Sequence, residues 1–129
     1  IDHLVKSVIL LSGQCYLEKQ TQNDMISRVI LYMQDHLRES ISVQQLADMV
    51  YVSKSYLSRA FKQKTGLSLM EYLNSLRMEA AKALLAASNM NTEEIAYRAG
   101  YRSTKFFYRA FRAYTGMSTR EYRKNGSDN

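Results

Sequence analysis

The feature that most constrains the fold of this 129-residue chain is an internal repeat with an offset of 50 residues. The segment YVSKSYLSRAFKQKTGLSLMEY, residues 51–72, returns as YRSTKFFYRAFRAYTGMSTREY, residues 101–122. Arg-Ala-Phe, Thr-Gly and Glu-Tyr stand at the same places in both copies. A repeat this literal predicts that one supersecondary unit is built twice.

Each copy contains the pattern of an amphipathic helix. In the first copy Ser53 is a favourable N-cap, and Gly66 stands where a helix would end on a glycine. At about 100° per residue, the apolar residues of each copy fall on one face: Leu57, Ala60 and Phe61 in the first, and Phe107, Ala110 and Phe111 in the second. Each helix is therefore expected to have a core side and a basic, hydrogen-bonding side.

A short helix is predicted before each copy, over residues 42–50 and residues 92–99. Both contain an aliphatic residue followed by alanine, which lets two helices cross closely and predicts a helix-turn-helix. The second turn is one residue longer than the first and contains Gly100, which can supply an unusual backbone angle.

The segment over residues 69–87 predicts the helix that joins the two units. Its expected buried stripe is Leu73, Leu76, Ala80 and Leu84. At about 1.5 Å per residue its length is about 28 Å, close to the ~34 Å between successive major-groove faces of B-DNA. The predicted fold is all-α: two helix-turn-helix motifs, over residues 42–66 and 91–116, are joined by a linker helix over residues 68–87.

Three segments in this order, LADMVYVSKSYLSRAFKQKTG, YLNSLRMEAAKALL and IAYRAGYRSTKFFYRAFRAYTG, followed by EYR, resemble the DNA-binding domain of the AraC/XylS transcription regulators. The resemblance covers about residues 30–124. The family usually has Ser-Pro where this chain has Ser118-Thr119, but a helix can begin without that proline. The resemblance implies double-stranded DNA and RNA polymerase as partners, and an activator of transcription in the cytoplasm, at the bacterial nucleoid.

The distribution of charge agrees with DNA binding. Residues 1–50 carry four Lys or Arg against six Asp or Glu, whereas residues 51–129 carry fourteen against six. Each repeated helix segment, residues 53–66 and residues 101–116, has four cations and no acid. A merely solvated basic surface is the alternative; cations opposite the core face of two repeated helices instead favour contact with phosphates and base edges.

A recognition helix reads bases with its N-terminal half and contacts phosphates with flanking residues. The candidates in the first motif are Lys54, Ser55, Ser58 and Arg59, with Lys62 one turn later toward phosphate. The candidates in the second motif are Arg102, Thr104, Lys105, Tyr108 and Arg109, with Arg112 behind them. The resemblance also places base-reading residues at the positions of Ser55, Ser58 and Arg59. Arginine can pair bidentately with guanine.

Four residues near these helices have open or supporting roles. Tyr108 can contact a base or pack against the protein. Tyr56 and Phe106 occupy matching positions and are expected to be partly buried supports. Arg77 matches a position that the family usually fills with arginine, and it can contact phosphate or form a structural salt bridge.

The two ends of the chain are expected to lie outside this domain, which spans residues 23–124. Residues 1–22 are predicted to be a helix, or a linker that contacts an absent domain or a second subunit. The chain begins with isoleucine, so it is expected to be a fragment of a longer protein with a ligand sensor or a phosphorylatable receiver. A homodimer of that protein remains open. The tail, residues 125–129, is predicted to be disordered.

No residue pattern suggests an enzyme, a metal or a cofactor. Cys15 is the single cysteine, and His3 and His36 have no second ligand at metal spacing. Phosphate loops and catalytic pairs are absent from the sequence, and the apolar run near the N-terminus is too short to span a membrane. A helical protein-interaction module that lost DNA readout is the alternative function, and the cations of both recognition helices argue against it.

Overall fold

The computed structural model describes residues 20–128, with side chains as far as residue 125. This part of the chain is helical throughout, with no strand. A helix over residues 20–35 is followed by α2 (Val43–Met49), α3 (Lys54–Thr65), α4 (Leu69–Ala87), α5 (Thr92–Arg98), α6 (Thr104–Thr115) and α7 (Thr119–Asp128). The predicted fold, two helix-turn-helix motifs joined by a long helix, is confirmed, and α4 has the predicted bounds. The helix predicted over residues 1–20 lies almost wholly outside the described residues.

Helices run across both of the predicted ends of the domain. The chain is already helical at residue 20, so the boundary predicted between residues 22 and 23 falls inside a helix. At the other end α7 continues to Asp128, where a disordered tail was predicted from residue 125. The side-chain amide of Asn125 donates to the sulfur of Met117 at 3.3 Å, which ties this part of α7 to the segment before the helix.

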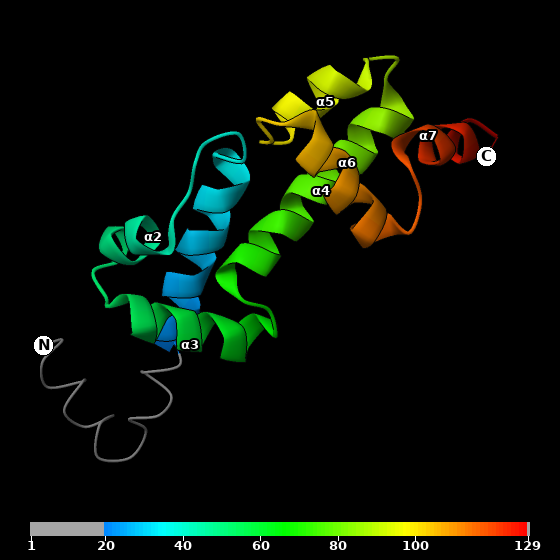
Figure 1. Cartoon of the computed structure of the whole chain (residues 1–129). Helices are drawn as coiled ribbons and strands as arrows, with labels where there is room; N and C mark the ends of the chain where they lie inside the picture. The colour runs from blue at the N-terminus through cyan, green and yellow to red at the C-terminus, as the bar shows by residue number, and fades with distance from the viewer. Residues whose placement is uncertain (1–19, 129) are drawn as a thin grey trace, which may run out of the picture.

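The helices form two lobes that share α4 (Figure 1). The first lobe contains the helix over residues 20–35, α2, α3 and the start of α4; the second contains the rest of α4 with α5, α6 and α7. The start of α4 buries Leu69 and Leu73 in the first core, and its second half buries Met78, Ala81 and Leu85 in the other. Of the predicted stripe only Leu73 is fully buried, while Leu76 and Leu84 are partly buried against the first and second cores, because α4 changes its buried face between the lobes.

The repeated aromatic residues build the same contact in each lobe. In the first, the ring of Tyr72 meets Phe61 edge-on, with centroids 5.3 Å apart at 89°. In the second, Tyr122 meets Phe111 at 5.6 Å and 84°. Both recognition helices end on a left-handed glycine, as the sequence predicts. The repeat in sequence is thus a repeat in packing.

The two turns differ at the residue with positive φ. The second turn places Gly100 there, with φ of 95°, whereas the first places Tyr51 there, with φ of 61°. A side chain in the left-handed region costs about 1–2 kcal/mol, which glycine avoids. The Tyr51 side chain is 89% exposed, so its packing does not offset this cost.

Replacing Tyr51 with asparagine, which tolerates the left-handed region, is therefore expected to stabilise the domain by about 0.5–1 kcal/mol. The free energy of unfolding in urea measures the change. Tyr97→Asn is the control, because Tyr97 is also exposed but lies within α5. An equal gain from both substitutions would contradict the explanation by backbone strain.

Arg77 joins the two lobes through backbone carbonyl oxygens rather than through a salt bridge, one of its two predicted roles. Its guanidinium donates to the backbone carbonyl oxygens of Leu37 at 3.1 Å and Glu39 at 3.0 Å. It also lies 5.9 Å from the ring centre of Tyr101, in the second lobe. Burial lowers the pKa of Arg77 and raises the pKa of Tyr101. The hydroxyl of Tyr101 donates to Asn74 Oδ1 at 2.6 Å, which adds a second bond across the junction.

Candidate nucleic-acid interface

The first recognition helix, α3, presents its polar side to solvent. The side chain of its N-cap, Ser53, accepts a hydrogen bond from the backbone of Tyr56 at 3.1 Å, and this fixes where the helix begins. The apolar face of α3 is buried, as predicted. All five site residues predicted on this helix are exposed: Lys54, Ser55, Ser58, Arg59 and Lys62.

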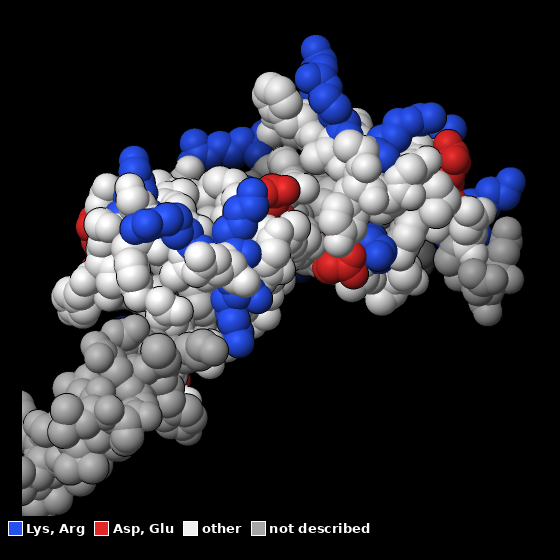
Figure 2. Space-filling model, turned by 90° about the horizontal axis from the view of Figure 1, so that it is seen from below, with Lys and Arg blue, Asp and Glu red and all other residues white. Residues whose placement is uncertain are grey.

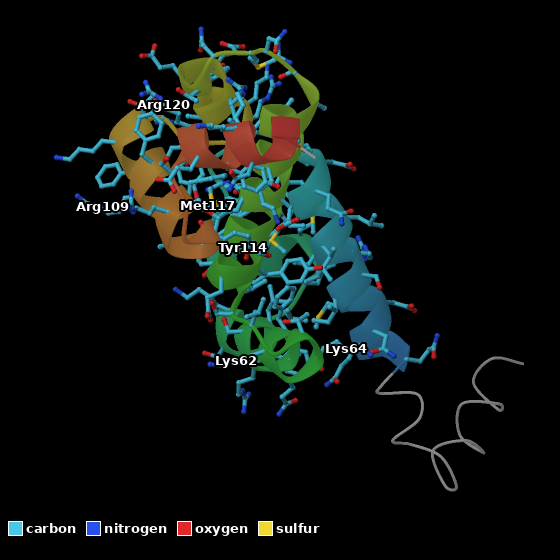
Figure 3. The ribbon with its side chains drawn as sticks, turned by 90° about the vertical axis from the view of Figure 1, so that its right-hand side faces the viewer. Lys62, Lys64, Arg109, Tyr114, Met117 and Arg120 are labelled. Carbon is cyan, nitrogen blue, oxygen red and sulfur yellow. The ribbon has the colours of Figure 1, made fainter. Side chains whose placement is uncertain are left out.

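The second recognition helix, α6, places most of its predicted residues on one exposed face. The exposed members are Arg102, which lies in the turn before α6, together with Lys105, Arg109 and Arg112. Thr104, at the first position of the helix, is half-buried. Figure 3 shows Arg109 projecting outward from α6, with Lys62 on α3 below it.

Tyr108 lies at the side of α6 that faces α5. Its hydroxyl is 2.8 Å from the hydroxyl of Thr92, at the start of α5. The side chain is still 40% exposed. The structure therefore places Tyr108 away from the centre of the exposed cationic face, while its ring edge remains open to solvent.

Cations on the two recognition helices form no ion pair with an acid of the described part of the chain. The ion pairs among the side chains of residues 20–125 join His36 to Glu39, Lys82 to Glu79, and Arg98 to Glu94, and all three lie off α3 and α6. The face seen in Figure 2 carries many Lys and Arg side chains and few acids. Such a surface attracts a polyanion, and its positive potential adds over neighbouring cations.

The C-terminal end of α6 is held against α4 by a small polar cluster. The hydroxyl of Tyr114 donates to Glu79 Oε2 at 2.9 Å, and Lys82 Nζ donates to the same oxygen at 3.0 Å. The bond from Lys82 and then the bond from Tyr114 hold the pKa of Glu79 below its ordinary value. The cluster positions the recognition helix on the helix that joins the lobes.

A cleft of about 810 Å³ lies beside α6, at the N-terminal ends of α5 and α7. Its lining includes four arginines: Arg109, Arg112, Arg120 and Arg123. Arg123 is committed to structure, because it donates to the carbonyl oxygens of Leu85 at 3.2 Å and Met90 at 2.6 Å. Arg120 is a residue that the sequence reasoning missed. The sequence signal for Arg120 is a cation in the first turn of α7, a position where the helix dipole would favour an acid.

The prediction that Tyr56 and Phe106 are partly buried supports is wrong for Phe106. Tyr56 is 38% exposed, and Phe106 is 62% exposed. Tyr56 accepts a hydrogen bond from Gln22 Nε2 at 3.0 Å, whereas the Phe106 ring lies 6.0 Å from the guanidinium carbon of Arg109. The helical wheel already indicates that Phe106 is exposed, because Phe106 falls outside the apolar face formed by Phe107 and Phe111.

Among the described side chains, residues 20–125, no three of His, Cys, Asp or Glu gather closely enough to hold a metal ion. No helix in the same range combines the length and apolar character needed to cross a membrane.

Comparison with known proteins identifies the family. The model of a helix-turn-helix domain matches residues 46–125. An AraC-type transcriptional regulator from Chromobacterium violaceum superimposes with a TM-score of 0.75 and 26% identity, over 81% of this chain and 93% of that one. The chain belongs to the AraC/XylS family of DNA-binding domains. Both helix-turn-helix units of the family are therefore present here.

Other members of the AraC/XylS family resemble the chain in sequence and structure. The transcriptional activator RhaS of Salmonella arizonae is 33% identical over 118 residues, which are 91% of this chain and 42% of RhaS. The chain thus spans less than half the length of the curated relatives that it matches. The C-terminal domain of AraT, a response regulator from Geobacillus stearothermophilus, has a TM-score of 0.76 and 34% identity, over 78% of this chain and 84% of that one. The DNA-binding domain of AdpA, solved with a target DNA, has a TM-score of 0.74 and 31% identity, over 78% and 90%.

Proposed function

We propose that the chain binds double-stranded DNA sequence-specifically, with α3 and α6 in adjacent major grooves, and that it regulates transcription. The observation that carries this proposal is the pair of repeated helices whose exposed cations form no ion pair among the described side chains of residues 20–125. α4, which joins the two motifs, is about 28 Å long, close to the ~34 Å between successive major-groove faces of B-DNA. Base readout then falls to the N-terminal halves of the helices, and phosphate contact to the residues that follow.

Within this proposal Arg59 and Arg109 read bases, because each is exposed at the same place on its helix. Lys62 and Arg112 lie one turn further along and contact phosphate. Ser55 and Ser58 leave a shallow surface on α3, whereas α6 carries larger side chains. The two motifs are therefore expected to prefer different sequences.

Selection of bound duplexes from a random pool, at physiological salt and with excess nonspecific DNA, tests the proposal. We expect two short boxes separated by about 10 base pairs between their centres. A single enriched box would limit readout to one motif. Retention without any enrichment, lost as salt rises, would reduce the function to backbone binding and favour a protein-interaction module.

Arg109→Ala is expected to lower affinity for the selected site by about 1–3 kcal/mol and to leave affinity for scrambled DNA almost unchanged. Lys62→Ala is the matched comparison on α3, because a phosphate contact weakens binding to every sequence and flattens the salt slope by about one unit. Dissociation constants on both duplexes, over a salt series, measure the two effects. Equal losses on selected and scrambled DNA for Arg109→Ala would exclude base reading by this residue.

The full regulator is proposed to be an activator that also contacts RNA polymerase in the cytoplasm, at the nucleoid. The name of RhaS, a transcriptional activator, supports this direction of regulation. AraT is a response regulator, so a receiver remains as reasonable as a ligand sensor for the rest of the protein. Homodimers of the full protein would place two such domains on one operator.

A further inference from the structure

Phe106 is an exposed aromatic residue on a helix that has no need of it for packing. It lies in the first turn of α6, and 62% of it is open to solvent. Its neighbour Phe107 is fully buried and supplies the core contact of this turn. A phenyl ring left in water gains free energy when a partner covers it, so Phe106 is available for recognition.

The surroundings of Phe106 define the partner that fits it. Arg109 lies one turn away on the same side of α6, with its guanidinium carbon 6.0 Å from the ring centre. Lys105 directly precedes Phe106 in the sequence and Arg102 lies four residues before it; both are exposed, and residues 101–116 contain no acid. An apolar protein surface would bury these cations without partners. A DNA major groove instead offers phosphates around its edge and an apolar methyl group on each thymine.

The first motif supplies an internal comparison. Tyr56 occupies the position of Phe106, but its hydroxyl accepts a hydrogen bond from Gln22 at 3.0 Å. That bond ties the ring to the helix over residues 20–35. Phe106 has no hydroxyl and cannot be held in this way; its ring instead lies 6.0 Å from the guanidinium carbon of Arg109. The two copies therefore use their aromatic residue differently.

We propose that Phe106 determines specificity in the second box by covering the 5-methyl group of a thymine, and that its ring positions Arg109 for an adjacent guanine. This inference rests on the proposed DNA binding by α6. The cation–π contact between the guanidinium and the ring restrains Arg109 before binding, which lowers the ordering cost of a bidentate contact. The preferred step is then a thymine beside a guanine.

Single replacement of thymine by deoxyuridine in the selected duplex tests the proposal, because it removes one methyl group and nothing else. The box read by α6 is identified as the one whose selectivity Arg109→Ala abolishes. For the unmodified chain we expect one thymine of this box at which deoxyuridine weakens binding about four-fold, the effect of one buried methyl group. Phe106→Ala should bind the two duplexes equally. Tyr56→Ala, the matched control, should keep the four-fold difference.

Two results would overturn the proposal. One is a four-fold difference that survives in Phe106→Ala; the other is a second box in which no thymine responds to deoxyuridine. Phe106→Gln, which keeps a long helix-compatible side chain, should behave as Phe106→Ala does, and circular dichroism of both variants should match the unmodified helix content. Failure of the DNA-binding proposal itself has a separate signature, since no box would then be enriched by the unmodified chain.

Discussion

Replacing Gly100 with alanine is expected to lower the free energy of unfolding by about 3 kcal/mol or more. At φ of 95° a side chain is strained by about 1–2 kcal/mol. The added Cβ would also overlap the backbone carbonyl of Leu37 and lie 2.8 Å from Arg77 Nε. Overpacking of this kind costs about 1–3 kcal/mol further. Because Leu37 belongs to the first lobe, the second turn would have to move away from it.

Gly116→Ala separates these two contributions. Gly116 has a similar φ of 79°, but a Cβ built there has no atom within 4 Å. Its substitution should cost only the backbone strain, about 1 kcal/mol. Urea unfolding of both variants gives the comparison. Equal losses would show that the close approach to Leu37 contributes nothing, and the tight contact between the lobes would then have no energetic basis.

The helices of this fold could be predicted because their signals are local. Serine caps, terminal glycines and the 3.6-residue period all lie within single segments, and the repeat doubled each of them. The junction between lobes could not be predicted in this way. Arg77 bonds to Leu37 and Glu39, about 40 residues earlier, through backbone carbonyls that carry no sequence signature. Similarly, α4 changes its buried face because it packs against two cores, whereas a single helical wheel assumes that a helix has one buried face.

The candidate site was predictable where polarity and periodicity agree. Arg59 and Arg109 are polar and lie opposite the core, so both principles place them at the surface. For Phe106, polarity and periodicity disagree: its apolar side chain suggests burial, whereas its position on the helical wheel suggests exposure. The wheel position was right, since Phe107 and Phe111 already fill that part of the core. An aromatic residue off the apolar face is thus informative about recognition.

Replacing Arg77 with methionine is expected to destabilise the domain by about 3 kcal/mol and to loosen the spacing between its two readers. The substitution keeps side-chain length but removes both donors to Leu37 and Glu39, leaving those carbonyls unpaired; hydrogen bonds from a charged group contribute about 1.5–3 kcal/mol each. The contact with the Tyr101 ring is also lost. Urea unfolding measures the stability, and it should be compared with Arg123→Met, which removes similar bonds within the second lobe alone.

DNA binding distinguishes a junction from ordinary support. Once the first motif is bound, a rigid junction holds the second motif at one fixed distance along the DNA. A two-box site therefore binds more tightly than a single box only when the spacing between its boxes matches that distance. Arg77→Met should therefore lose affinity for the selected two-box duplex while tolerating one base pair more or less between the boxes. Arg123→Met, assayed under conditions where both variants are folded, should keep the original spacing preference. If Arg77→Met kept it too, the remaining contacts, such as the bond between Tyr101 and Asn74, would suffice to fix the spacing.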